Sequence, residues 1–128
     1  MAGEPILIVD DNPTNLKLVA YLMSASGYQV TTAIDADAAI AAIANHRPRL
    51  ILMDLQLPGV DGLELTRQLK ADPSTRDIIV VAVTAYAMKG DQARAMAAGC
   101  DDYITKPIDT RTLPEAIARH LRRSEDSS

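Results

Sequence analysis

The chain has 128 residues, 48% of them hydrophobic, so it is long enough to bury a core as a single domain. Its net charge of −4 argues against binding to nucleic acid phosphates. A single cysteine excludes an internal disulfide, and no apolar run approaches the about 20 residues of a membrane span. We therefore expect one cytoplasmic domain over residues 1–128, with a disordered tail at residues 124–128.

The first half of the chain alternates between strand and helix patterns. An apolar strand at residues 6–9 precedes a helix that Asn12 caps and Gly27 ends. A strand at residues 28–33 has the alternating pattern of an edge, and Asp35 caps the next helix, which closes at residues 46–48. We expect Ile40 on the buried side of that helix. The strand at residues 50–53 is apolar throughout, as in a strand buried on both faces.

The second half continues the same alternation. A short helix at residues 62–70 is followed by a continuous apolar strand at residues 78–83. The next helix is expected to bury the residues spaced i, i+3, i+4 and i+7, which are Ala93, Met96, Ala97 and Cys100. A short strand at residues 103–105 and a helix at residues 110–122 complete the pattern. Five strands alternating with five helices predict an α/β fold, a doubly wound parallel sheet with helices on both faces.

Polar residues stand where these strands end. Asp10 and Asp11 follow the first strand, Asp54 the third, Thr84 the fourth and Lys106 the fifth. In an open parallel sheet the ligand site lies beyond the carboxyl ends of the strands, so we expect these side chains to meet there.

Three carboxylates in one crevice would repel each other by about 4 kcal/mol per pair at about 4 Å and an effective dielectric near 20. A hard divalent cation removes this conflict, and oxygen ligands favour Mg²⁺ over zinc. One aspartate could then attack phosphorus while the Thr84 hydroxyl and the Lys106 ammonium stabilise the transferred group.

With these residues the chain resembles the CheY-like receiver domain of two-component response regulators along nearly its whole length. The matching positions are the acidic pair Asp10 and Asp11, the phosphoacceptor Asp54, the switch residues Thr84 and Tyr103, and the Lys106–Pro107 pair. The segments at residues 10–15 and 84–90 are similar to single-domain regulators of the DivK type and to receivers attached to hybrid kinases. The resemblance implies the flavodoxin-like strand order 2-1-3-4-5.

The resemblance also implies the chemistry of the site. Asp54 would accept a phosphoryl group from a histidine kinase or a histidine phosphotransferase. Mg²⁺ would be bound by Asp11, Asp54 and the backbone carbonyl of Gln56, with Asp10 acting through water. The domain would catalyse its own phosphorylation and dephosphorylation without being a stand-alone enzyme. Gln56 and Tyr86 would tune hydrolysis, and the bulk of Tyr86 predicts a long-lived phosphoform.

The resemblance also implies a conformational switch that controls the binding of a partner protein. Lys106 would pair with the phosphate, while Thr84 would move toward it and vacate space for Tyr103. The surface formed by the fourth helix, fifth strand and fifth helix, including Met88 and Lys89, would then bind a downstream protein. We expect a monomer or weak dimer that binds neither nucleic acid nor membrane.

Four other uses stand as alternatives to a diffusible regulator. One is a relay intermediate that passes its phosphoryl group on. A Mg²⁺-dependent phosphatase of the haloacid dehalogenase type would need a second acid two residues after the nucleophile, where Gln56 stands. A flavodoxin-like cofactor carrier would meet repulsion from Asp10 and Asp11, and a phosphorylation-independent scaffold is compatible with the residues but not favoured by them.

Overall fold

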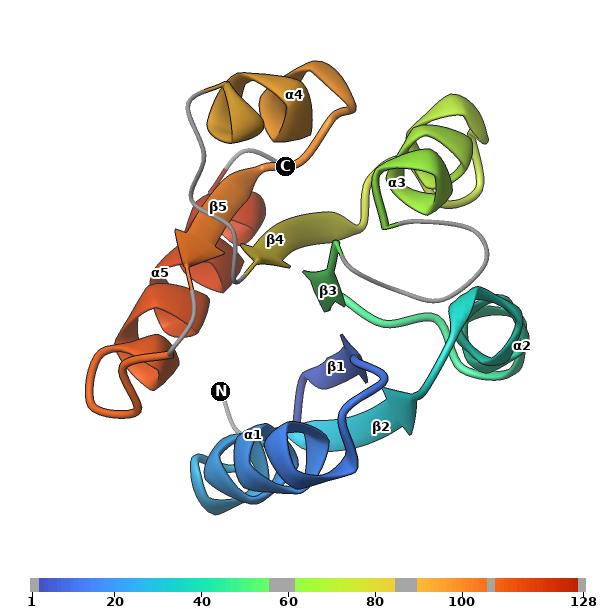
Figure 1. Cartoon of the computed structure of the whole chain (residues 1–128). Helices are drawn as coiled ribbons and strands as arrows, with labels where there is room; N and C mark the ends of the chain where they lie inside the picture. Colours follow the sequence, from blue (N-terminus) through green and yellow to red (C-terminus); the bar gives the residue numbers. More distant parts are fainter. Residues whose placement is uncertain (1–2, 56–61, 85–89, 106–107, 127–128) are drawn as a thin grey trace.

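A parallel sheet forms the centre of the computed structural model, which describes residues 3–55, 62–84, 90–105 and 108–126 (Figure 1). Within these residues the strand order is β2-β1-β3-β4-β5, which confirms the predicted topology. The strands are β1 Pro5–Val9, β2 Gln29–Ala33, β3 Leu50–Asp54, β4 Ile79–Thr84 and β5 Asp102–Thr105. The helices are α1 Pro13–Ala25, α2 Ala36–Asn45, α3 Gly62–Ala71, α4 Asp91–Ala97 and α5 Leu113–Asp126.

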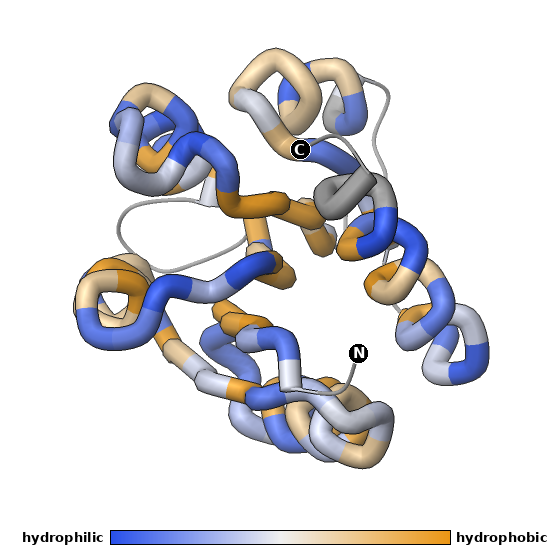
Figure 2. Tube along the Cα trace, turned by 180° about the vertical axis from the view of Figure 1, so that it is seen from behind, coloured by the Kyte–Doolittle hydropathy of each residue, from blue (hydrophilic) through white to orange (hydrophobic). Residues whose placement is uncertain are grey.

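The core lies on both faces of the sheet. On one face α2, α3 and α4 pack on the alternate strand residues Leu7, Ile51 and Val80. On the other face α1 and α5 pack on Ile8 and Leu52, among others. Figure 2 shows hydrophobic residues concentrated in the central strands, with hydrophilic stretches on the surrounding helices. The aliphatic runs therefore become buried strands because each of their two sides meets a helical layer.

Strand register aligns the carboxyl ends of the strands. Val9 of β1 pairs with Met53 of β3, and Asp54 of β3 pairs with Val83 of β4. Thr84 in turn lies beside Thr105, the last residue of β5. The residues that end the strands or follow them consequently share one edge of the sheet.

The predicted caps of the first two helices are present. Asn12 accepts hydrogen bonds from the backbone of Thr14 and Asn15 at the start of α1. Asp35 accepts one from the backbone of Ala38, 2.8 Å away, at the start of α2. Gly27 follows α1 with a φ of 96°, a conformation that glycine adopts without steric cost.

The buried side of α4 differs from its prediction. Met96 is 46% exposed, and Ala93 and Ala97 are exposed too, whereas Ala95 and Ala98 are buried. Alanines lie on both the exposed and the buried side of this helix, so the apolar pattern does not define which side faces the sheet. Cys100, past the end of α4, is buried as expected, while Ile40 on α2 is 46% exposed and was wrongly assigned to the buried side.

The last helix is displaced toward the carboxyl terminus relative to its prediction. It begins at Leu113 because Pro114, which lacks a backbone N–H, is accommodated only in the first turn. Before it, the backbone N–H groups of Thr112 and Leu113 donate to the carbonyl of Asp109 and form a turn. The helix continues to Asp126, so residues 124–126, expected in a disordered tail, are helical.

Candidate functional site

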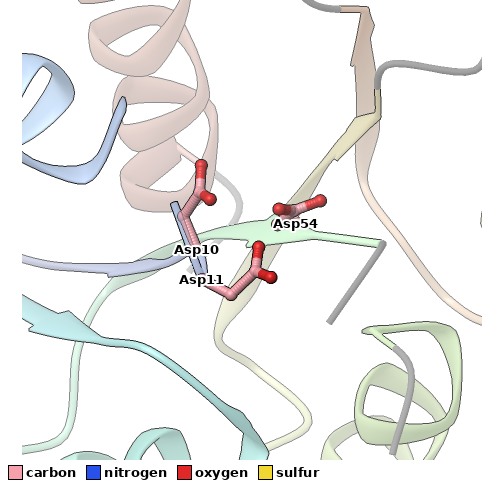
Figure 3. Close-up of side chains that lie close together, drawn as sticks. All are labelled: Asp10, Asp11 and Asp54. Carbon is pink, nitrogen blue, oxygen red and sulfur yellow. The ribbon is translucent and has the colours of Figure 1, made fainter. Parts of the chain in front are cut away.

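Three carboxylates converge at the carboxyl edge of the sheet. Oxygen atoms of Asp10, Asp11 and Asp54 all lie within 4.8 Å of one another. Asp10 and Asp54 are 3% and 2% exposed, whereas Asp11 is exposed to solvent. Figure 3 shows the three side chains grouped at the carboxyl ends of β1 and β3. Sequence analysis predicted this grouping, and the strand register produces it.

Asp10 is oriented by the segment that starts α1. Its Oδ1 accepts a hydrogen bond from the backbone N–H of Asn12 at 2.9 Å, and its Oδ2 accepts one from the side-chain amide of Asn15. The Asp10 backbone N–H donates to the carbonyl of Ala33 on the neighbouring strand. Asn12 thus joins the acidic pair to the helix that it caps. Sequence analysis gave Asn12 the capping role and missed its bond to Asp10.

Gly62 allows α3 to approach the backbone of Asp54. A Cβ atom at Gly62 would lie 2.5 Å from the Asp54 carbonyl oxygen and 2.9 Å from the Leu55 Cα, closer than real Cβ contacts. The adjoining Leu55 N–H donates to the carbonyl of Val83, which ties the end of β3 to β4. Gly62 is therefore a supporting residue that the sequence analysis did not identify, since a single glycine has no pattern to mark it.

The two predicted switch residues occupy different depths. Thr84 is 1% exposed at the end of β4, on the same edge as Asp54. Tyr103 is half-buried on β5, opposite Ala82, and packs against the core layer formed with α2, α3 and α4. Six other residues named in the sequence analysis lie outside the described residues: Gln56, Tyr86, Met88, Lys89, Lys106 and Pro107.

The donor set of the cluster is suited to a hard cation. Its three side chains offer only carboxylate oxygens, the ligand type that Mg²⁺ prefers, and one of the three is open to solvent. Gathering like charges in a largely buried place costs free energy that a divalent cation would offset.

Sequence comparison assigns the chain to a class. The family description "response regulator receiver domain" matches residues 6–118, and the chain belongs to this family of two-component signalling proteins. It is 47% identical to the polar-differentiation response regulator DivK of Brucella anthropi over 116 residues, which cover 91% of this chain and 94% of the relative. Receiver domains are signalling modules, so the family argues against the phosphatase and cofactor-carrier alternatives.

Solved structures agree with the family assignment. A CheY-like receiver domain protein from Methanospirillum hungatei superposes with a TM-score of 0.91 at 31% identity, covering 99% of this chain and 100% of that one. The receiver domain of a sensor histidine kinase from Pseudomonas aeruginosa has a TM-score of 0.83 at 36% identity, with 92% and 97% covered. That domain holds a magnesium ion in its active site cleft.

Among the helices of the described residues, none combines the length and the apolar character needed to cross a membrane.

Proposed function

We propose that Asp54 accepts a phosphoryl group from a phosphohistidine and that the modified domain binds a protein target differently from the unmodified one. The observation that carries this proposal is the buried carboxylate cluster at the carboxyl edge of the sheet. Family membership supports it, because receiver domains take part in two-component signalling.

Asp54 is the best placed nucleophile of the three acids. It ends the central strand β3, between β1 and β4, and the adjacent Leu55 N–H and Gly62 hold its backbone in place. Asp10 is engaged by the Asn12 N–H and the Asn15 amide, which suits an orienting role. In the transfer, an Asp54 oxygen forms a bond to phosphorus as the P–N bond breaks and its electron pair returns to the imidazole nitrogen of the donor.

Asp11, Asp54 and the Gln56 carbonyl would hold Mg²⁺, with Asp10 contributing through water. Bound there, Mg²⁺ would supply charge neutralisation and a coordination position for a phosphoryl oxygen. The magnesium ion in the active site cleft of the Pseudomonas aeruginosa domain supports this assignment. The Thr84 hydroxyl and the Lys106 ammonium would bond the other phosphoryl oxygens.

The switch follows from bonds that only one arrangement of β4 and β5 can make. Phosphorylation adds nearly two negative charges. Inverting a 1:99 population requires about 5.5 kcal/mol of differential interaction, which a few charge-assisted bonds of about 1.5–3 kcal/mol each would provide. Thr84 moving toward the phosphoryl group would open space for Tyr103, which is half-buried at the edge strand.

Two surfaces would serve the donor and the target. On α1, which begins directly after the acidic cluster, Leu18 and Tyr21 are 51% and 75% exposed, an apolar contact area for a histidine kinase or a histidine phosphotransferase. A groove of about 570 Å³ lies along β5 and the start of α5 and includes Tyr103, Ile108 and Leu113. It belongs to the α4–β5–α5 surface that we assign to the downstream target.

Labelling by acetyl phosphate tests the chemistry. The wild-type protein should become labelled in the presence of Mg²⁺ and lose labelling on chelation, and Asp54→Asn should remain unlabelled. Asp77→Asn is the matched control, because Asp77 is exposed on the loop before β4, and it should label like the wild type. Label retained in Asp54→Asn would refute the assignment.

A pulldown separates the regulator from the relay intermediate. Only a regulator must prefer one state, so a partner captured equally by beryllofluoride-treated and untreated protein would favour the relay.

The lifetime of the label tests the proposed roles of Gln56 and Tyr86. We expect a slow loss of phosphate, and a half-life of seconds would contradict an obstructing Tyr86.

A further inference from the structure

The start of β5 is held by two consecutive aspartates that bind to different elements. Asp101 and Asp102 lie at the end of the strand opposite to the carboxylate cluster. Asp101 is bonded to α3 and β4, whereas Asp102 is bonded to α5. Since α3 and α5 pack on opposite faces of the sheet, the strand is anchored from both sides.

Lys70 forms the anchor from α3. Its ammonium donates to the carbonyls of Ile78 and Arg76 at 2.7 Å and 3.2 Å and to Asp101 Oδ2 at 3.0 Å. These three bonds match the three donors of a lysine. Asp101 also accepts from the Val80 N–H at 2.8 Å, and its own backbone N–H donates to the Val80 carbonyl at 2.7 Å.

The stem of Lys70 is positioned by a glycine. A Cβ atom at Gly99 would lie 2.7 Å from the Lys70 Cγ, so the lysine passes directly over the Gly99 backbone. The φ of Gly99 is 106°, a conformation that favours glycine. The loop between α4 and β5 is thus shaped to receive this side chain.

His120 forms the anchor from α5. Its Nε2 lies 2.7 Å from Asp102 Oδ2, and the side chain is only 14% exposed. The other oxygen of Asp102 accepts a hydrogen bond from the backbone N–H of Tyr103 at 2.8 Å. His120 therefore acts, through Asp102, on the backbone of the residue to which we assign the aromatic part of the switch.

The opposite end of β5 has a different character. Thr105 is exposed and lies beside Thr84, and it leads to Lys106. At about 3.3 Å per residue, the anchored Asp102 and the exposed Thr105, which pairs with Thr84, are about 10 Å apart. If β5 were not anchored, a displacement of Thr105 would shift the whole strand along β4. Because the start of the strand is fixed, the same displacement would instead tilt the strand about that point.

We propose that Lys70 and His120 are positioning residues of the phosphorylation response, holding the start of β5 still so that the strand pivots there. This inference rests on the proposed function, because it concerns how a signal at Asp54 reaches the α4–β5–α5 surface. Lys70 and His120 bond to Asp101 and Asp102 and not to the cluster of Asp10, Asp11 and Asp54, so phosphorylation by acetyl phosphate should proceed normally in Lys70→Met and His120→Phe.

Amide hydrogen exchange with and without beryllofluoride and Mg²⁺ tests the pivot in the full chain. In the wild type, beryllofluoride should change exchange at Ile104 and Thr105 and leave the Val80 amide, which is bonded to Asp101, unchanged. In Lys70→Met, beryllofluoride should accelerate exchange at Val80 about tenfold, as expected for one lost hydrogen bond. Arg67→Met is the control and should behave like the wild type, because Arg67 lies on the same helix but forms an exposed ion pair with Glu64.

The outcomes separate three cases. A merely structural Lys70 would give faster exchange at Val80 by the same factor in both states, which would overturn the pivot. A wild-type protein in which Val80 responds as strongly as Thr105 would overturn it too, and this measurement does not depend on any variant folding. A wild-type protein that neither labels with acetyl phosphate nor responds to beryllofluoride would refute the proposed function itself.

Discussion

The two ends of the sheet use charge in opposite ways. At the carboxyl edge, Asp10, Asp11 and Asp54 bring like charges within 4.8 Å. At the amino-terminal edge, Lys70 and Asp101 form an ion pair of 3.0 Å that also bonds three backbone groups. The first arrangement costs stability and prepares the site for a cation, whereas the second contributes stability. The functional site and the structural anchor thus differ in the sign of the interaction energy between their charged groups, which is repulsive in the site and attractive in the anchor.

Each end of the sheet also has a glycine at a position where a side chain does not fit, Gly62 at the carboxyl edge and Gly99 at the amino-terminal edge. Single alanine substitutions of these glycines include the largest loss of stability that we expect. Gly62→Ala should lower the free energy of unfolding by about 3 kcal/mol, because the new methyl group meets the Asp54 and Leu55 backbone. Gly99→Ala should cost about 1.5 kcal/mol, since its main penalty is the positive φ while the Lys70 stem can move. Urea denaturation measures both, and equal losses would contradict the distinction between backbone and side-chain contacts.

Magnesium should stabilise the folded protein through the carboxyl edge of the sheet and not through the amino-terminal edge. At a concentration 100 times its dissociation constant, MgCl₂ should raise the free energy of unfolding by about 2.7 kcal/mol in the wild type. Asp11→Asn should remove most of this gain, whereas Asp101→Asn should keep it, because Asp101 lies at the other edge. Thermal unfolding with and without MgCl₂ provides the measurement, and a full gain in Asp11→Asn would exclude Asp11 as a ligand.

Neutralising one acid at each end should change stability with opposite signs. Without divalent cations, Asp11→Asn should raise the free energy of unfolding by about 1 kcal/mol, because it relieves repulsion at a solvent-exposed position. Asp101→Asn should lower it by about 1.5 kcal/mol, because Lys70 and the Val80 N–H lose a charged acceptor. Urea denaturation in chelator at low salt tests the pair, and the same sign for both would invalidate the comparison.

Cys100, next to Asp101, should give the smallest effect, seen only at alkaline pH. Burial is the main cause that raises the pKa of the Cys100 thiol above its ordinary value, while the Thr66 hydroxyl partly opposes the shift. A raised pKa favours the folded state below the pKa of the unfolded thiol, and this stability is lost as pH rises toward the folded value. Above pH 8.5 the wild type should lose at most about 1.4 kcal/mol per pH unit more than Cys100→Ala. Parallel stability curves would show that the thiol ionises equally in both states.

Much of the fold is encoded in patterns that can be read locally. The runs at residues 6–9, 50–53 and 78–83 are apolar at every position, a pattern typical of strands covered on both faces, and all but Ile78 lie in β1, β3 and β4. Asn12 and Asp35 form their caps through bonds to residues two or three positions away, which local sequence determines. The α4 helix shows the limit of such patterns, because its alanines lie on opposite sides and only contact with the sheet decides which of them are buried.

The sequence by itself determined the order of strands and helices, the acids at the strand ends and the receiver family, because each can be read from the types of residues and their positions along the chain. Only the tertiary structure decided which glycine supports Asp54, which helices anchor β5, and that Asn12 bonds Asp10 as well as capping α1. The anchors of β5 join residues that are far apart along the chain, Lys70 with Asp101 and Asp102 with His120, whereas the Asn12–Asp10 bond spans only two positions and depends on how the backbone turns after β1. Such pairs have no periodicity of their own, and they meet only when the sheet register brings their elements together.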